Sequence, residues 1–270
     1  MTMGIIFGII DVIILVMEGS LMEKVLITGA SSGMGKSMAY YLHSLGNYEL
    51  VLVARSKDKL ENIKRELGDN VEIISMDLSK SNNCIKLHDM VNDVDILINN
   101  AGFGLFGEFV KTDLNKEMEM IDTNIKAVHI LTKLYLKDMI KNNRGKVLNV
   151  ASIAGFMPGP LLDTYYASKN YVLRLSQSIK EELRRNKSKV SISVLCPGPV
   201  KTNFDDVAGV KFSLNGMDSD YVAKYAIDNM LKGKFIIIPG MSIKALRVLS
   251  KILPDSVLVK MVYVSQKRKS

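Results

Sequence analysis

Residues 24–35 read KVLITGASSGMG and join a short apolar run to a glycine-rich loop. The run Val25–Thr28 carries aliphatic and β-branched side chains, which favour a buried strand. In the loop, glycines at positions 29, 33 and 35 let the backbone turn sharply and approach a ligand closely. A helical pattern then starts at Gly35, and the amide groups at a helix N-terminus attract phosphate. This stretch predicts a strand–loop–helix unit that binds a dinucleotide, with a glycine-rich turn without a ligand as the alternative.

The alternation of short apolar runs and longer helical stretches continues along the chain. The predicted strands are Val25–Thr28, Glu49–Ala54, Val71–Ser75, Asp95–Ile98, Lys146–Val150, Val190–Leu195 and Phe235–Ile238. The clearest predicted helices are Gly35–Leu45, Lys57–Leu67, Asn115–Ile140, Thr164–Arg185 and Asp218–Leu231. Several strands are apolar without alternation, as in a sheet that is buried on both faces. We therefore predict an α/β fold with a doubly wound, parallel, seven-stranded sheet, and functional residues just beyond the carboxyl ends of its strands.

The composition narrows the class of protein. The 270 residues are 47% hydrophobic and 24% charged, which excludes a disordered chain, and no biased tract marks a linker, so we predict a single domain. The two cysteines fit a reducing compartment and a cytoplasmic location, and the three histidines lack the spacing of metal ligands, so no metal is predicted. The net charge of +8 suits a phosphate-bearing ligand, an anionic membrane or nucleic acid. Acids alternate with bases in stretches such as 180–185, KEELRR, which argues against nucleic acid.

The first 21 residues are interpreted separately. Gly4–Met17 is apolar apart from Asp11, but it is shorter than the ~20 residues of a membrane-spanning helix and no Lys or Arg precedes it. The triplet Met17-Glu18-Gly19 can be encoded by ATG-GAG-GGN, which contains the bacterial ribosome-binding sequence GGAGG. Our hypothesis is that translation starts at Met22, and a peripheral membrane anchor is the alternative.

The segment after the second predicted strand indicates which cofactor is used. It reads Val-Ala-Arg-Ser-Lys at positions 53–57, where an acid is expected if the adenosine ribose carries a free 2′-hydroxyl. A cation at this place binds a 2′-phosphate. The sequence therefore favours NADP(H) over NAD(H), with Arg55 as the main determinant and Ser31 or Ser32 as helpers. A surface arginine without a ligand is the alternative.

A tyrosine and a lysine mark the candidate reaction centre. Tyr165 and Lys169 are four residues apart, so on a helix they share one face. A free tyrosine has a pKa of about 10, and a nearby ammonium stabilises its phenolate. We expect Tyr165 to exchange a proton with a substrate oxygen and Ser152, after the fifth strand, to bind the same oxygen. Tyr166 is out of phase and is interpreted as a packing or substrate-wall residue.

Taken together, these motifs resemble the short-chain dehydrogenase/reductase family from about residue 24 to about residue 239. The matching elements, in the order typical of the family, are the glycine loop, Asp77-Leu78, Asn99-Asn100-Ala101-Gly102, Asn124, Ser152, Tyr165 to Lys169, and the run from Pro197 to Thr202. A Y-x-x-x-K pair alone is common by chance, but seven ordered elements at strand ends are specific. The resemblance implies a Rossmann-type fold and a homo-oligomer, dimeric or tetrameric.

The resemblance also implies roles for individual residues. The implied catalytic residues are Asn124, Ser152, Tyr165 and Lys169. The implied cofactor-binding residues are Gly29, Ser31, Ser32, Gly33, Met34, Gly35, Arg55, Asp77, Leu78, Asn100, Ala101, Gly102, Tyr165, Lys169, Pro197, Gly198, Val200 and Thr202. Within these sets, Lys169 holds the nicotinamide ribose, Asp77 contacts the adenine amine, and Thr202 binds the carboxamide. Asn124 anchors a water that links Lys169 to solvent, with a helix-interior amide bonded to backbone as the alternative, and Asn99 supports the sheet.

Two segments and the C-terminus bear on the substrate. Ala154–Asp163 and Asn203–Met217 are mostly apolar and favour a hydrophobic ketone, aldehyde or alcohol. Beyond the last strand, Ile243, Leu246, Leu249 and Leu253 recur at helical spacing, with Lys244, Arg247 and Lys251 on the opposite face. A second apolar run, Val257–Val264, leads to the basic residues 267–269. These helices form either a flap over the substrate cleft or a subunit interface, or they attach to an anionic membrane surface.

The sequence thus predicts three parts: an apolar extension at 1–21, a Rossmann-fold NADP-binding catalytic domain at 22–240, and basic amphipathic helices at 241–270. The predicted function is that of an NADP(H)-dependent oxidoreductase that interconverts a hydrophobic carbonyl compound and its alcohol. The alternative is a non-catalytic NADP-binding regulatory or membrane-associated protein of the same fold. The substrate and the direction of the reaction stay open.

Overall fold

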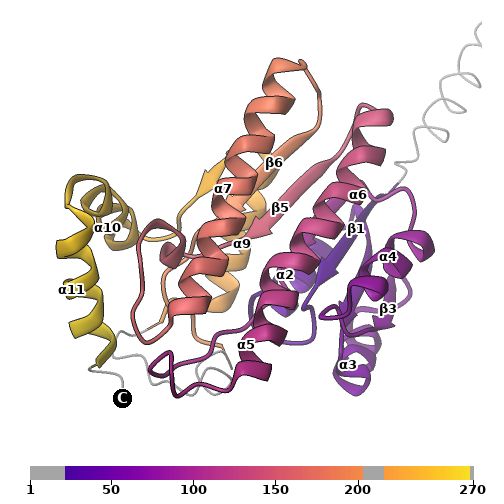
Figure 1. Ribbon diagram of the computed structural model, residues 1–270. Coiled ribbons are helices and arrows are strands. Elements are labelled where there is room, and N and C mark those ends of the chain that lie inside the picture. Colours follow the sequence, from indigo (N-terminus) through magenta and orange to yellow (C-terminus); the bar gives the residue numbers. More distant parts are fainter. Residues whose placement is uncertain (1–21, 203–215, 268–270) are drawn as a thin grey trace, which may run out of the picture.

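The computed structural model describes residues 22–202 and 216–267 (Figure 1). The hypothesis about residues 1–21 therefore falls outside the described residues. The same holds for most of the predicted substrate segment Asn203–Met217 and for the basic residues at 268 and 269. None of the described helices is long and apolar enough to cross a bilayer.

The described residues form one sheet of seven parallel strands, as predicted. The strands are β1 (Glu23–Thr28), β2 (Tyr48–Ala54), β3 (Val71–Ser75), β4 (Ile96–Asn99), β5 (Lys146–Val150), β6 (Ser191–Leu195) and β7 (Ile236–Ile237). Their order across the sheet is β3-β2-β1-β4-β5-β6-β7. The chain moves outward from β1 to β3 and then returns to the other side of β1 with β4. Ligands in such sheets bind at this switch point, beyond the carboxyl ends of the strands.

Helices cover both faces of the sheet (Figure 1). One face packs against α2 (Gly33–Ser44), α3 (Lys57–Leu67) and α9 (Ser219–Leu231). The other face packs against α4 (Ser81–Met90), α6 (Val128–Lys141) and α7 (Asp163–Arg185). The remaining helices are α5 (Leu114–Ile121), α10 (Met241–Ile252) and α11 (Asp255–Lys267). The last two stand together at one side of the molecule, opposite β3 and α3 (Figure 1).

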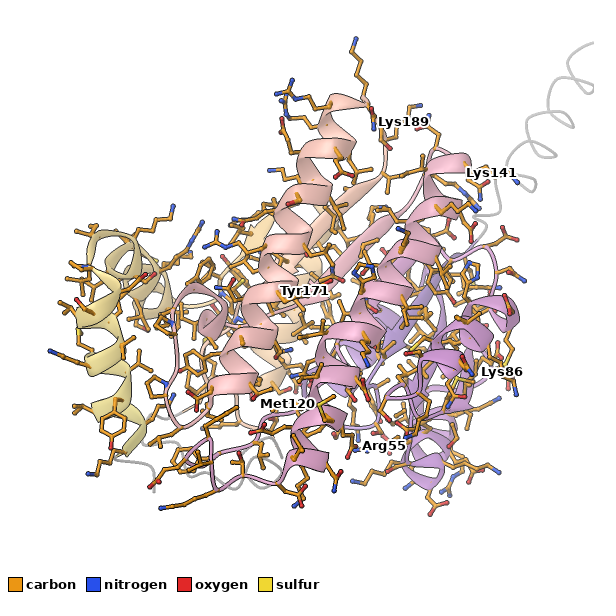
Figure 2. All side chains as sticks on the ribbon, in the orientation of Figure 1. Arg55, Lys86, Met120, Lys141, Tyr171 and Lys189 are labelled. Atoms are coloured by element: carbon orange, nitrogen blue, oxygen red, sulfur yellow. The ribbon has the colours of Figure 1, made fainter. Side chains whose placement is uncertain are left out.

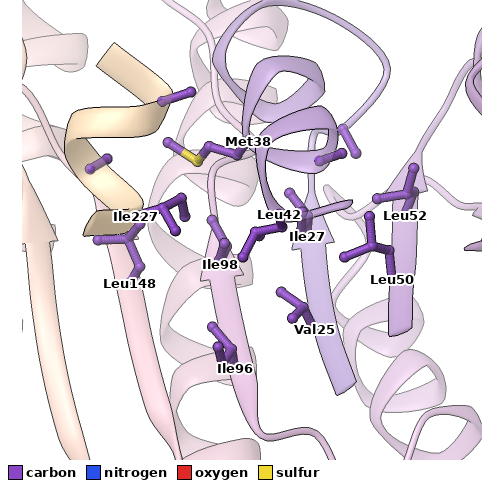
Figure 3. Packing of buried hydrophobic residues seen from close by; sticks show 14 of the residues in the cluster. Val25, Ile27, Met38, Leu42, Leu50, Leu52, Ile96, Ile98, Leu148 and Ile227 are labelled. Atoms are coloured by element: carbon purple, nitrogen blue, oxygen red, sulfur yellow. The ribbon is translucent and has the colours of Figure 1, made fainter. Parts of the chain in front are cut away.

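The core follows from the period of two along each strand. In β1, Val25 and Ile27 face α2, whereas Leu26 between them faces the opposite helix layer. Figure 3 shows the first layer, where aliphatic side chains of β1, β2, β4 and β5 surround Met38 and Leu42 of α2. Both faces of the sheet are thus buried, which explains why the central strands are apolar without alternation.

The structure differs from the sequence prediction in the region Asn115–Ile140. In place of one helix, α5 and α6 are separated by the π-helical segment Asp122–Ala127. The Asn124 side chain lies in this segment and bonds to the backbone of Phe103 in both directions, at 3.1 and 2.9 Å. These long-range bonds hold Asn124 in the widened turn. Such π-bulges are frequent at functional sites.

Helix α4, which starts with Ser81-Asn82-Asn83, was not predicted, because its sequence has no clear helical pattern.

Candidate active site

Two cavities lie side by side beyond the carboxyl ends of the strands. The first, of about 310 Å³, is lined by the glycine loop and by the ends of β2, β3 and β4. The second, of about 370 Å³, is lined by the end of β5, the start of α7, the segment after β6, and α10 and α11. Met34, Asn100, Gly102 and Thr202 line both cavities. The two cavities therefore form one continuous groove across the switch point.

The glycine loop is held against the end of β4. The Asn100 side-chain amide donates to the carbonyl oxygens of Thr28 and Gly29, at 3.0 and 3.1 Å. Gly29 has φ +67°, in the left-handed region, and a Cβ on it would lie 2.8 Å from the Ala101 Cα. A Cβ on Gly35 would lie 2.4 Å from the Gly29 carbonyl oxygen. The backbone packs so closely here that glycine is required at both positions.

Helix α2 begins directly at this loop with groups that suit an anion. Within the described residues, Ser32 precedes the helix without a side-chain capping bond, and the first turn of α2 carries no acid. The leading amide groups of a helix have no partner within the helix, and the helix dipole adds positive potential there. Ser31, Ser32 and Gly33 line the first cavity at this end. The arrangement therefore presents hydrogen-bond donors where a phosphate can bind.

Arg55 lines the first cavity at the end of β2 and is largely exposed. Its guanidinium forms an ion pair with Glu119 of α5 at 2.6 Å, beside that helix in Figure 2. Lys59, in the first turn of α3, lines the same cavity and was missed in the sequence, although it lies only four residues beyond Arg55. Burial alone would raise the pKa of the Asp77 carboxyl. Hydrogen bonds from Ser79 and the charge of Arg55 lower this pKa by more than burial raises it, so the net shift is downward. This end of the groove thus holds two cations and an ionised carboxylate.

Tyr165 and Ser152 meet in the second cavity. Ser152 follows β5, and its Oγ accepts a hydrogen bond from the Ala154 amide at 3.1 Å. Burial raises the pKa of Tyr165 to about 12, although a hydrogen bond with the Ser152 side chain acts in the opposite direction. The sequence led us to expect a pKa held down by Lys169. In the structure burial has the largest influence on this pKa, so Tyr165 carries its proton at neutral pH.

Lys169 lies one helical turn beyond Tyr165 and is buried. Its Nζ donates to the Val150 carbonyl oxygen at 2.9 Å and lies 5.8 Å from the centre of the Tyr165 ring. Burial lowers the pKa of Lys169 to about 8, so the ammonium form still predominates at pH 7. A Cβ on Gly102 would lie 3.3 Å from this Nζ, which brings the segment after β4 against the lysine.

Asn124 and Gly35 lie behind the groove and do not line it. The Asn124 amide is buried, and its Nδ2 donates to the Ser168 hydroxyl at 3.1 Å as well as to the Phe103 carbonyl oxygen. Ser168 in turn donates to the Tyr165 carbonyl oxygen at 2.7 Å. Asn124 therefore ties the segment after β4 to the turn of α7 that carries Tyr165. The other predicted cofactor and catalytic residues line one or both cavities.

The far wall of the second cavity comes from the C-terminal helices. Ile243, Leu246 and Leu249 of α10 and Leu258, Met261, Val262, Ser265 and Gln266 of α11 line it. Gln266 is buried, and its side-chain amide donates to the Tyr166 hydroxyl at 2.7 Å. Tyr166 lines the cavity beside Tyr165, as expected of a wall residue. Gln266 was missed in the sequence, because no local pattern links residues 100 positions apart.

The Asn99 side chain belongs to the sheet. Its Nδ2 donates to Asn149 Oδ1 at 2.9 Å and to Thr132 Oγ1 at 3.0 Å, within a buried polar network between β4, β5 and α6. This contact agrees with the supporting role predicted for Asn99. The buried network holds the strand ends that carry the groove.

The sheet order and the glycine loop define a Rossmann-type α/β protein with a cofactor-sized groove at its switch point. A family model described as short chain dehydrogenase matches residues 23–209, and the chain belongs to this family of oxidoreductases. The 3-oxoacyl-[acyl-carrier-protein] reductase of Rickettsia prowazekii is 30% identical over 181 residues, which cover 67% of this chain and 74% of the relative.

Two solved structures are similar over most of their length. A short-chain dehydrogenase from Sphingobium yanoikuyae in complex with NADPH has a TM-score of 0.76 and 27% identity, and the match covers 86% of this chain and 96% of that one. A short-chain dehydrogenase/reductase from Burkholderia phymatum in complex with NAD has a TM-score of 0.77 and 25% identity, with 84% and 92% covered.

Proposed function

We propose that the protein uses NADP(H) to interconvert a hydrophobic ketone or aldehyde and its alcohol, with Tyr165 as the acid and base. One observation carries this proposal: Ser152, Tyr165 and Lys169 converge in an apolar cavity that joins a phosphate-suited groove at the switch point. The alternative, a non-catalytic cofactor-binding protein of the same fold, would not need this convergence.

The groove fits a dinucleotide. Gly29, Gly33 and Gly35 leave no room for a Cβ where the loop meets its neighbours, and the amide groups of α2 begin there. Asp77 and Leu78 lie at the adenine end, whereas Asn100, Ala101 and Gly102 border the middle of the groove. Pro197, Gly198, Val200 and Thr202 border the nicotinamide end. When bound there, NADPH supplies the hydride that the carbonyl carbon accepts.

The residues of the chain supply the proton and the polarisation. Tyr165 donates its hydroxyl proton to the carbonyl oxygen, and a pKa of about 12 keeps that proton available at neutral pH. The Ser152 hydroxyl donates to the same oxygen and stabilises its developing negative charge. The Lys169 ammonium, 5.8 Å from the tyrosine ring, stabilises the phenolate left after donation. In the reverse direction Tyr165 first gives up its own proton, and the phenolate then takes the proton of the alcohol.

The preference for NADP(H) is proposed from the cations of the adenosine end. Arg55 and Lys59 line the first cavity together with the hydroxyl-bearing Ser31 and Ser32. A guanidinium binds a phosphate through two parallel hydrogen bonds, which an unphosphorylated ribose does not offer. The similar structures include complexes with NADPH and with NAD, so the choice between them rests on these side chains.

The substrate class is proposed from the second cavity. Apart from Ser152, Tyr165, Tyr166 and Lys169 near the reaction centre, its wall is dominated by aliphatic side chains of α10, α11 and the segment 153–162. A cavity of about 370 Å³ with such a lining suits an apolar molecule of moderate size.

We also propose that the protein is a homo-oligomer and that it is located in the cytoplasm. The oligomer is supported by Leu114 and Met118 of α5 and Tyr171 of α7, whose side chains are exposed on helices.

The test is a screen of ketones and aldehydes of increasing chain length with NADPH, followed by isolation of the alcohol. We expect oxidation of NADPH in equal amounts with alcohol formation, and higher kcat/KM for apolar than for charged carbonyl compounds. NADPH binding without turnover of any compound would favour the regulatory alternative. Absence of NADPH binding by the folded protein would contradict the proposal as a whole.

A further inference from the structure

Helix α10 has two apolar faces, where the sequence pattern indicated one. Ile243, Leu246 and Leu249 face the second cavity, as predicted. Met241, Val248 and Ile252 form a second stripe with Ala245, at spacings of three and four residues, and all four are exposed. The predicted division into an apolar face and a cationic face is therefore incomplete, because an exposed apolar stripe lies between them.

Helix α11 repeats this arrangement. Leu258, Val262 and Gln266 point toward the cavity, whereas Val257, Met261 and Val264 are exposed at spacings of four and three residues. Tyr263 is also exposed next to this stripe. Both helices stand at one side of the molecule, away from the edge strand β3 (Figure 1). Each of the two helices thus adds exposed apolar residues to this side of the molecule, and an exposed apolar surface of this kind marks an interaction site.

The charges of these helices indicate what this surface binds. Residues 241–267 contain five cations, Lys244, Arg247, Lys251, Lys260 and Lys267, and a single acid, Asp255. A second copy docked through the same surface would bring like charges together, which is unfavourable. Apolar stripes flanked by lysines and a tyrosine instead complement a bilayer that carries anionic head groups.

The surface is continuous with the second cavity. Leu249 of α10 and Met261 of α11 line the cavity and are 38% and 48% exposed. These two side chains therefore lie where the cavity borders the exposed surface of the two helices. An apolar molecule that passes between α10 and α11 meets apolar side chains of both helices.

We propose that α10 and α11 dock the protein onto an anionic lipid surface and open the second cavity toward the acyl chains. Resting on the proposed function, the substrate is then a carbonyl compound dissolved in the membrane. It enters between the two helices without crossing water.

Flotation of the full-length protein with vesicles tests the docking directly, without any enzymatic readout. Vesicles of phosphatidylcholine with about 30 mol% phosphatidylglycerol are compared with pure phosphatidylcholine at low salt. We expect the protein to float with the anionic vesicles and to bind the neutral ones at least about tenfold less. Salt at about 0.5 M NaCl should release most of it, because the lysine contribution is screened.

A matched pair of variants locates the contact. Val248 and Ile252 are 58% and 72% exposed and do not line the cavity, and Ile85 and Met90 on α4 are 47% and 53% exposed. We expect Val248→Ser/Ile252→Ser to lower partitioning into anionic vesicles at least about tenfold, since two apolar side chains no longer leave water. Ile85→Ser/Met90→Ser should bind like the wild type.

Failure of the wild-type protein to float, while it still binds NADPH, would overturn the proposal. So would equal binding of both double variants, which would assign the contact to another part of the chain. A different result would contradict the proposed function: the protein floats with the vesicles but reduces no carbonyl compound. If the docking and the proposed function are both correct, Val248→Ser/Ile252→Ser keeps its activity on short carbonyl compounds dissolved in water. Its activity on a long-chain substrate presented in vesicles falls at least about tenfold.

Discussion

Lys169 connects the chemistry of the site to the stability of the protein. Its ammonium is buried and donates a hydrogen bond to the Val150 carbonyl oxygen, and burial lowers its pKa to about 8. A lowered pKa means that the folded state binds the lysine proton more weakly than the unfolded state does. The charge that we propose stabilises the Tyr165 phenolate therefore costs folding free energy at neutral pH.

This cost predicts a pH dependence. Below pH 8 both states carry the proton and the cost is present in full, and between pH 8 and the ordinary pKa of 10.5 the folded state releases the proton first, so stability rises. We compare the free energy of unfolding of the wild type with that of Lys169→Met. Between pH 7.5 and pH 10 this difference should change by about 2 kcal/mol in favour of the wild type. Urea unfolding of both proteins at the two pH values measures this gap. A gap that stays constant would show that the lysine pKa is not lowered.

Arg55 carries the second prediction at this scale. Replacement by Asp removes the guanidinium that we propose binds the 2′-phosphate and adds a charge that repels this phosphate, so kcat/KM with NADPH should fall about 10- to 100-fold relative to NADH. Steady-state kinetics with both cofactors give this ratio. Arg65→Asp on α3, exposed and outside both cavities, is the matched control and should leave the ratio unchanged. An unchanged ratio in Arg55→Asp would contradict the assignment of NADP(H).

At the scale of single residues, the sequence predicts features that depend on local spacing and does not predict contacts between distant residues. The sequence could indicate that Tyr165, Lys169 and Ser152 lie in one cavity, because their spacing and their positions at strand ends are local features. The ion pair of Arg55 with Glu119 and the raised pKa of Tyr165 were not predicted, because each depends on burial or on partners far away in the chain.

At the scale of elements, the unit of β1, the glycine loop and α2 depends on close backbone contact. We predict that Gly35→Ala, whose Cβ would lie 2.5 Å from Asn100 Nδ2, lowers NADPH affinity at least about tenfold and destabilises the protein by about 1 to 3 kcal/mol. Gly46→Ala is the control, because Gly46 has φ +78° but nothing within 4 Å of an added Cβ. It should cost about 1 kcal/mol and leave NADPH affinity unchanged. Equal NADPH affinity in the two variants would contradict the role of the loop. Thermal unfolding and NADPH titration measure both quantities.

The elements also differ in how well they could be predicted. Strands β3 and β5 and helix α3 have the predicted bounds, because apolar runs and helical periodicity are local signals. The π-helical segment Asp122–Ala127 interrupts a continuous helical pattern, and its residue Asn124 bonds to Phe103 and Ser168. Tertiary contacts of this kind override periodicity and leave no trace in the local sequence.

At the scale of the whole molecule, the groove joins parts that are far apart in the chain. The phosphate end is built by residues 29–35, the reaction centre by residues 152–169, and the cavity wall by residues 243–266. The order of the motifs predicted the first two, because strand ends of a parallel sheet meet at one edge. A flap of the C-terminal helices over the cleft was one of three interpretations of the sequence, whereas the bond of Gln266 to Tyr166 could only be found in three dimensions.

The central claim is that Tyr165 delivers the proton to the substrate oxygen while hydride is transferred. Single-turnover oxidation of bound NADPH by a carbonyl substrate, in wild type, Tyr165→Phe and Tyr166→Phe, tests it most directly. Both tyrosines line the same cavity, with ring centres 6.2 Å apart, so the variants are closely matched. We expect Tyr165→Phe to bind NADPH normally and to react at least about 100-fold more slowly, and Tyr166→Phe to stay within about tenfold of the wild type. A wild-type rate in Tyr165→Phe, or an equal loss in both variants, would contradict the account.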